Sequence, residues 1–344
     1  MSAARSTGGR PRLAVLMGDP GGVGPEMAVK LLARSANLAA ADVVLVGDAS
    51  TLAAGERTAG TKLHTLPAPA WGGLRFEPGR VAHLLQSDPG ESVLGQSTAA
   101  SGAAALAALA AATDAAREGR VDAIVFAPLN KHSLRLGGMP HEDELRYMQE
   151  RFGVKGFTCE FNITDQLWTS RVTSHVPLRE VAALITPQAV RDAVHIIDGA
   201  LRRAGIARPR IAVSGLNPHA GDGGSIGHEE IEIIAPAVRQ LLEEGIGASG
   251  PWSPDTVFIA ARRGDFDAVV SMYHDQGQIA MKLMGFERGV TLHGGLPVPV
   301  ATSASGSAFD IAGKGIATIE GLQHAFDLCV RMAGARQGAA ATSV

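Results

Sequence analysis

The sequence predicts an α/β protein with a mostly parallel sheet and helices on both faces. Apolar, β-branched runs alternate along the chain with segments whose apolar residues recur at helical spacing, which is the pattern of such sheets. The 344 residues give room for two domains. Glycine is abundant, with 42 residues, while aromatic residues make up only 4% of the chain. This composition is typical of a loop-rich protein whose helices pack closely.

Six runs rich in Val, Ile and Leu are expected to form strands, because short continuous apolar runs are typical of strands buried on both faces. In chain order they are RLAVLMG (12–18), DVVLVGD (42–48), VDAIVFAPL (121–129), RVTSHVPL (171–178), RIAVSGLNPH (210–219) and FDAVVSMYHD (266–275). A further short strand pair is expected near 288–303, where Gly and Pro are dense.

Four longer segments between these runs have apolar residues at helical spacing and are expected to form helices. They are GPEMAVKLLARSA (24–36), the Ala-rich segment 98–118, TPQAVRDAVHIIDGALRRAG (186–205) and HEEIEIIAPAVRQLLEEG (228–245).

The composition excludes several classes of protein. Apolar residues make up 46% and charged residues 19%, and the net charge is −3, so nothing indicates a nucleic-acid or anionic membrane partner. Cys159 and Cys329 form no CxxC motif, which excludes a zinc ribbon or a thioredoxin-type site. No signal-like segment and no apolar run of about 18 residues is apparent, so we expect a cytoplasmic protein without a membrane span.

Polar motifs follow the expected strands. In open parallel sheets, ligands bind beyond the carboxyl ends of the strands, so these motifs are candidates for one shared cleft. They are MGDPGGVGPE, APLNKHS, TSHVPLR, GLNPHAGDGG and MYHDQGQ.

Three histidines stand at expected strand ends among small or turn residues: His175, His219 and His274. Three neutral imidazoles suit a divalent transition metal that keeps an open position for substrate. The alternative is that each is a hydrogen-bonded structural histidine, because ligands far apart in sequence lack a diagnostic local spacing.

The first glycine loop, GDPGGVGPE (18–26), follows a strand and opens a helix but matches a dinucleotide fingerprint poorly. Pro20 and Pro25 interrupt it, so we predict no Rossmann domain. Asp19 and Glu26 could contact the cleft or, more commonly for such residues, cap the helix.

Eight motifs in order along the chain carry a resemblance to a known family. The sequence from about residue 12 to about residue 332 resembles the 4-hydroxythreonine-4-phosphate dehydrogenase family. The motifs are MGDPGGVGPE, APLNK, TSHVPLR, GLNPHAGDGGSIGHEE, GPWSPDT, MYHDQG, GFERGV and GSAFDIAGKGIA.

The resemblance implies an isocitrate/isopropylmalate-dehydrogenase-like fold with two α/β/α domains and a cleft between them. We expect a first domain of 11–130 plus 300–340 and a second of 131–299. The resemblance also implies a homodimer whose active sites draw on both subunits.

The chemistry implied by the resemblance is oxidation of a secondary alcohol with NAD or NADP and a divalent metal. The family's metal-binding histidines fall on the three already selected, and three His ligands favour zinc over magnesium, manganese, cobalt or nickel. His141 and Lys282 map to substrate contacts, and Asp255 and Asp275 lie near the metal. Asp275 or Lys282 could take the hydroxyl proton, and decarboxylation could follow where a carboxylate is β to the new ketone.

The sequence departs from the family at positions that hold the substrate phosphate. Glu142 replaces a threonine, Thr291 an asparagine and Val300 an arginine. Losing the arginine removes a contact worth about 1.5–3 kcal/mol, and Glu142 would oppose a dianion. We therefore expect a non-phosphorylated hydroxy acid or dihydrodiol carboxylate. The alternatives are the phosphorylated threonine derivative of vitamin B6 synthesis, or a non-catalytic binding protein on the same fold.

Overall fold

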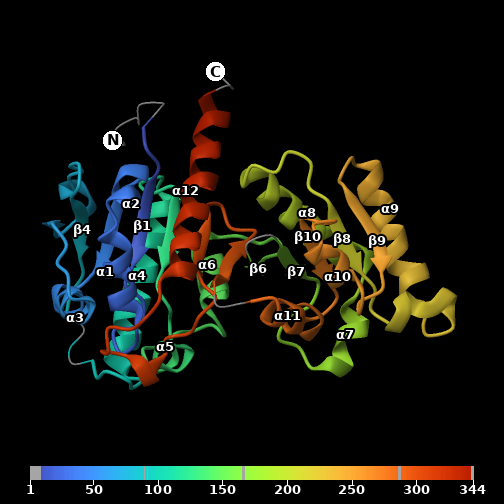
Figure 1. The fold of residues 1–344 in the computed structure, drawn as a ribbon, viewed down its shortest axis with the longest axis horizontal. Helices are drawn as coiled ribbons and strands as arrows, with labels where there is room; N and C mark the ends of the chain where they lie inside the picture. The colour runs from blue at the N-terminus through green and yellow to red at the C-terminus, as the bar shows by residue number, and fades with distance from the viewer. Residues whose placement is uncertain (1–8, 89, 91, 165–166, 286–287, 342–344) are drawn as a thin grey trace. The chain divides into compact units, whose positions relative to one another are not determined.

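The computed structural model describes residues 9–88, 90, 92–164, 167–285 and 288–341 (Figure 1). The chain forms two compact units, Met1–Lys155 with Leu296–Val344, and Gly156–Gly295. In both, helices pack against a sheet, so the predicted α/β class is confirmed. Residues 131–155, expected in the second domain, belong instead to the first unit. Within this segment, Ser133 and Gly137 pack so closely on Gly102 of the first unit that a Cβ at position 102 would meet their backbone.

The first unit contains six strands, and every pairing between them is parallel. In spatial order they are β3 (Thr65–Ala68), β4 (Val81–Leu85), β2 (Asp42–Gly47), β1 (Arg12–Leu16), β5 (Ala123–Phe126) and β12 (Val300–Ser303). The expected strands 12–18, 42–48 and 121–129 correspond to β1, β2 and β5.

Side-chain caps fix where several helices of the first unit begin. Asp48, Thr98, Asn130 and Asp143 each accept hydrogen bonds from backbone N–H groups of the following first turn. The helices are α1 (Gly24–Leu32), α2 (Ser35–Ala40), α3 (Ala49–Ala59), α4 (Ala99–Arg117), α5 (Lys131–Leu136), α6 (Glu144–Phe152) and α12 (Glu320–Ala341).

The glycine loop before α1 is built for close packing. Gly18 has φ +77°, and a Cβ at Gly24 would lie 2.3 Å from the Met17 carbonyl oxygen.

Asp19 does not cap α1, whose N-cap residue is Val23. The Asp19 carboxylate accepts a hydrogen bond from the Gly21 N–H, and burial raises the pKa of this carboxyl. Glu26 binds Lys30 at 2.6 Å, so both acidic residues have structural partners.

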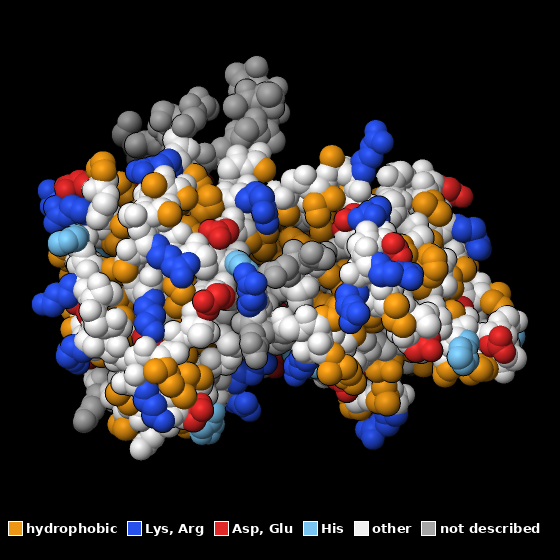
Figure 2. Space-filling model, viewed as in Figure 1, with side chains coloured by type: hydrophobic (Ala, Val, Ile, Leu, Met, Phe, Trp, Pro, Cys, Tyr) orange, Lys and Arg blue, Asp and Glu red, His pale blue; other side chains and the backbone are white. Residues whose placement is uncertain are grey.

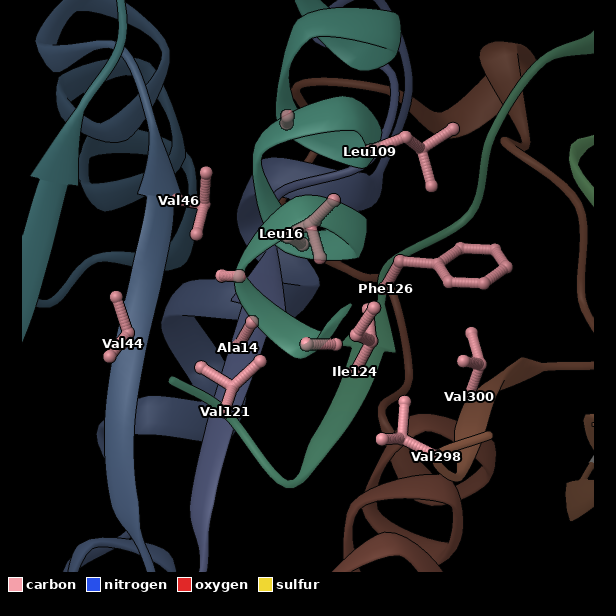
Figure 3. Packing of buried hydrophobic residues seen from close by; sticks show 14 of the residues in the cluster. Ala14, Leu16, Val44, Val46, Leu109, Val121, Ile124, Phe126, Val298 and Val300 are labelled. Atoms are coloured by element: carbon pink, nitrogen blue, oxygen red, sulfur yellow. The ribbon is translucent and has the colours of Figure 1, made fainter. Parts of the chain in front are cut away.

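The core of the first unit lies between its sheet and α4 (Figure 3). Ile124 and Phe126 of β5 point into it with Leu109 of α4, and Val298 and Val300 lie beside them. Val300 is 0% exposed. Helix α4 is long and apolar enough to span a membrane by length and composition, but half of it is buried in this core, which is the ordinary environment of a core helix.

In the described part of the second unit, five strands run in one direction and one, β6, runs in the opposite direction. Strand β6 (Cys159–Ile163) is antiparallel to both β11 (Val290–Gly294) and β7 (Trp168–Arg171). Parallel pairing continues from β7 to β10 (Ala268–Ser271), β8 (Ile211–Ser214) and β9 (Ala248–Trp252). The expected mostly parallel sheet is therefore confirmed, with β6 as the exception. Strands β11 and β12 lie in the region 288–303, where short strands were expected.

The helical segments of the second unit are α7 (Leu178–Leu184), α8 (Pro187–Arg203), a 3₁₀ turn (Pro218–Gly224), a π turn (Glu230–Ile234), α9 (Ala235–Glu243), α10 (Val257–Arg262) and α11 (His274–Leu283). Two expected strands differ from those observed. The segment expected as a strand at 171–178 is a loop from 172 to 177, because β7 spans Trp168–Arg171 and shares only its last residue with that prediction. The strand expected at 266–275 is shorter, because β10 ends at Ser271, so His274 and Asp275 open a helix.

The buried position of Val300 gives a direct test of the first unit's core. We expect Val300→Arg to lower the free energy of unfolding by about 3–5 kcal/mol, because the new charge would be buried without a partner. Urea denaturation of the purified variant measures this, and Leu136→Arg, at a half-exposed position of the same unit, is the matched control. Equal stability of the two variants would show that position 300 is open to solvent.

Candidate active site

The structure brings His175 and His274 together in the second unit. His175 lies in the loop after β7, His274 is the first residue of α11, and their ring centres are 5.8 Å apart. Zinc–nitrogen distances of about 2.1 Å put two imidazoles on one tetrahedral ion with ring centres roughly 5 Å apart. The separation of the two rings is therefore close to that of two ligands on a single ion.

A cavity of about 280 Å³ lies beside this pair. The loop 173–176 and α7 line one side of it, and Tyr273, His274 and Asp275 line the other. Figure 1 shows α7 and α11 at the same end of the strands of this unit. The size is near the lower end of pockets that take small molecules, so substrate could reach an ion held by the two histidines.

Backbone strain marks two of the predicted ligands. His175 has φ +54° and His219 has φ +52°, in the left-handed region that costs non-glycine residues of order 1–3 kcal/mol. Only five non-glycine residues of the described chain have positive φ, and Ala220 and Asp222 extend the strained run at His219. Strain of this kind collects at ligand and active sites.

His219 is not gathered with the other two. His219 is exposed and lies in the 3₁₀ turn. The start of this loop is fixed by Glu230, whose carboxylate accepts hydrogen bonds from the N–H groups of Leu216 and Asn217 at 2.7 Å each. Within the described ranges, no site with all three histidine nitrogens within 4.8 Å of one another is formed. The structure thus assembles two of the three predicted ligands.

Three predicted catalytic residues have different surroundings. The Asp275 carboxylate lies 2.7 Å from Nδ1 of His274, so it can accept that N–H and leave Nε2 for a metal. Lys282 is exposed two turns further along α11, on the same face as Asp275. At Asp255, a hydrogen bond from Ser253 at 2.6 Å lowers the carboxyl pKa, so this group is ionised at neutral pH.

The predicted substrate residues His141 and Glu142 belong to the first unit. His141 contacts the Glu150 carboxylate, and Glu142 lies 3.5 Å from Arg146 one turn away. The Glu142 side chain is 63% exposed, so solvent and Arg146 screen its charge. It would oppose an anionic ligand less strongly than the sequence predicted.

The other two predicted substrate residues are on strands. Thr291 is half-buried on β11, and its hydroxyl lies 3.5 Å from Nδ2 of Asn162. The prediction that Val300 contacts substrate is wrong for this structure, because its side chain packs wholly within the core. Position 300, where the family has an arginine in the sequence alignment, therefore does not face a pocket in this structure.

Sequence reasoning missed a polar group in the second unit. Glu160, Asn162, Arg171 and Gln278 are joined by hydrogen bonds next to the two histidines. Glu160 and Asn162 alternate with apolar residues along β6, a pattern that in an antiparallel strand also describes an ordinary solvent-facing side.

Charged side chains of both signs cover the face shown in Figure 2. Lys and Arg side chains are interspersed there with Asp and Glu over both units.

Comparisons with known proteins place the chain in a family. The family model described as "Pyridoxal phosphate biosynthetic protein PdxA" matches residues 39–329. A protein of Pseudomonas aeruginosa described as "Putative 4-hydroxythreonine-4-phosphate dehydrogenase 2" is 50% identical over 327 residues, covering 94% of this chain and 97% of that protein.

Solved structures agree. A 4-hydroxythreonine-4-phosphate dehydrogenase from Burkholderia phymatum is 35% identical with TM-score 0.79, covering 94% of this chain and 98% of that one. A terephthalate 1,2-cis-dihydrodiol dehydrogenase from Burkholderia xenovorans LB400 is 30% identical with TM-score 0.68, covering 93% and 98%. A β-decarboxylating dehydrogenase from Thermococcus kodakarensis, 15% identical with TM-score 0.52 over 92% and 81%, shares the fold, which confirms the predicted fold class. The resemblance in the sequence motifs is confirmed as well: the chain belongs to the PdxA family of dehydrogenases.

Proposed function

We propose that this protein is a metal- and NAD-dependent dehydrogenase that oxidises the secondary alcohol of 4-hydroxythreonine 4-phosphate. The observation that carries the reaction class is the pair His175 and His274 beside a cavity, with strain at His175. The substrate is supported by the relatives, whose names specify this compound at 50% and 35% identity.

The sequence favoured a non-phosphorylated substrate because of three departures from the family, at Glu142, Thr291 and Val300, and two of them carry less weight in the structure. Val300 belongs to the core, so its side chain does not line a pocket, and the Glu142 charge is exposed and close to Arg146. A dihydrodiol carboxylate remains the second candidate, because the terephthalate dihydrodiol dehydrogenase is also similar, though less so than the Burkholderia phymatum enzyme.

His175 and His274 would hold the ion, with His219 as the third ligand, and three imidazoles favour zinc or another transition metal. The bound ion would polarise the substrate hydroxyl and lower its pKa. Asp275 lies 2.7 Å from Nδ1 of His274, so with the proton on Nδ1 it would accept that N–H and keep Nε2 available for the ion. Asp275 and Lys282 lie on the same face of α11 and are the candidates for accepting the substrate proton, while the lowered pKa makes Asp255 a weaker base.

Hydride would pass from the alcohol carbon to the nicotinamide. The product has its new ketone β to the carboxylate, so loss of CO₂ can follow. NAD is preferred over NADP on family grounds alone. Two buried, unpaired cysteines fit a cytoplasmic location.

We further propose a homodimer with shared active sites. Leu178 lines the cavity and is 70% exposed, while Ile279 and Leu283 on α11 are 60% and 84% exposed. Apolar side chains gathered near a site are typical of a surface that a second chain covers.

The proposed function is tested by NADH formation with added divalent metal on three substrates: 4-hydroxythreonine 4-phosphate, four-carbon sugar acids and aromatic dicarboxylate cis-dihydrodiols. We expect turnover of the phosphorylated compound. His175→Ala and His274→Ala should each lower kcat/KM by about 100-fold or more, about 2.7 kcal/mol of transition-state stabilisation.

The matched control for these variants is His195→Ala, which removes a histidine of the same unit that is paired with Glu244 on other elements. Turnover of a dihydrodiol alone would overturn the substrate assignment but keep the reaction class. Full activity of the two histidine variants would overturn the metal centre.

Ser253 gives a pH test. We expect Ser253→Ala to raise the pKa of Asp255 towards its ordinary value of 3.8, because the hydrogen bond that favours the carboxylate is lost. Since the folded-state pKa is lowered, the stability that Asp255 contributes is present above the unfolded-state pKa and is lost as pH falls through the folded-state value. Carboxyl ¹³C NMR titration of both proteins measures the midpoint; an unchanged midpoint would exclude Ser253 as the cause.

The proposed dimer is tested by light scattering after size exclusion. We expect the wild-type protein to have the mass of two chains. Leu283→Glu should shift it towards one, since a charge would be buried at the interface. A monomeric wild-type protein would contradict the proposal. Leu242→Glu, at an exposed leucine on α9, is the control.

A further inference from the structure

A buried polar face lies beside the histidine pair. On β6, Glu160 and Asn162 point to one side of the sheet and Phe161 to the other, and Thr291 and His293 of β11 stand opposite Asn162 and Glu160. Polar groups at the middle of a sheet are costly unless hydrogen-bonded, so their arrangement needs an explanation.

Arg171 is the centre of this face. It is the last residue of β7, and it is 4% exposed. Its guanidinium makes three directed contacts: Nη2 donates to Glu160 Oε2 at 2.9 Å, Nη1 to Asn162 Oδ1 at 3.0 Å, and Nε to Ser174 Oγ at 2.9 Å. Glu160 balances the charge, and the other two contacts hold neutral groups.

Those two neutral contacts lead to the two histidines. Ser174 directly precedes His175, whose strained backbone needs support from its surroundings. Asn162 Oδ1 also accepts from Nε2 of Gln278, one helical turn after His274 on α11. One guanidinium is therefore linked to the loop that carries His175 and, through a single amide, to the helix that carries His274.

We propose that Arg171 is a positioning residue that fixes the separation of His175 and His274 for metal binding. The metal-binding part of this inference rests on the proposed metal centre. The hydrogen bonds that hold the His175 loop and the His274 helix do not depend on a metal. The guanidinium group of arginine is planar and has its donors at fixed angles, which suits such a role. Lysine carries a single point charge on a flexible chain.

The competing explanation is that Arg171 only neutralises Glu160 within the sheet. A lysine would also neutralise Glu160, but it could not hold Asn162 and Ser174 at the same time. Arg171→Lys and Arg171→Met therefore separate the two explanations.

The first measurement is hydrogen exchange on the metal-free protein. We expect Arg171→Met and Arg171→Lys to raise exchange in both 173–178 and 274–282, with little change elsewhere in the unit. Ser174→Ala should affect the first segment alone and Gln278→Met the second alone, and these milder variants preserve the test if Arg171→Met does not fold.

The second measurement is calorimetric titration with Zn²⁺ or Mn²⁺. Loss of residues that orient metal ligands typically weakens binding 10–100-fold, and we expect this range for Arg171→Met and Arg171→Lys. Arg210→Met is the matched control, because Arg210 makes a forked pair with Asp267 in the same unit. It should bind metal as the wild type does.

The outcomes are distinguishable. If the wild type binds metal and Arg171→Lys restores both exchange protection and affinity, Arg171 is only a counter-charge and the positioning role is overturned. If the wild type binds no metal, the proposed metal centre fails, while exchange in the two segments still decides whether Arg171 holds them. Unchanged exchange in all variants would overturn the proposal outright.

Discussion

The parallel register between β7 and β10 sets the geometry of the candidate site. Arg171 stands opposite Ser271 at the ends of the two strands, and the pairing continues past them, with Val172 N–H donating to Ser271 and Thr173 N–H to Met272. His175 and His274 follow within four residues of these bonds. Backbone pairing therefore brings the two segments close together, and the proposed contacts of Arg171 then fix the separation of the two side chains.

This backbone pairing explains how strain at His175 can persist. A left-handed conformation is unfavourable for histidine, and the loop keeps it because both sides are tied down: Thr173 Oγ1 donates to the Met272 carbonyl at 2.8 Å, and Ser174 accepts from Arg171. The strain is local, and the contacts that offset it are distributed over β6, β7 and β10. A site with preorganised ligands is the expected product of such an arrangement.

Much of this could be predicted from the sequence. The continuous apolar strands β1, β2 and β5 and the long helices α4 and α8 were visible as patterns, because burial on both faces or on one stripe leaves a periodic signature. His175 and His274 were selected as strand-end residues, and each lies shortly after a strand, His175 in the loop after β7 and His274 at the start of α11. The end of β7 was not found, since Val172 and Val176 extend the apolar run although the backbone turns at His175.

Other features had no sequence signal. Helix α11 begins at His274 without a side-chain cap, so nothing in MYHDQG indicated a helix start. An alignment position does not show which face of β12 a side chain occupies, and so Val300 was assigned to a pocket instead of the core. Asn162 lies on β6, which was not among the expected strands, and nothing in the sequence indicated that Arg171 is buried, because the partners of both residues come from elements far apart in sequence.

The same network bears on how substrate and metal could influence each other. Nδ2 of Asn162 lies 3.5 Å from the hydroxyl of Thr291, while Oδ1 of the same amide accepts from Arg171 and Gln278. An amide is rigid and planar, so its two ends cannot turn independently of each other. If substrate contacts Thr291 and the two histidines hold an ion, as proposed, both contacts depend on the orientation of this one side chain.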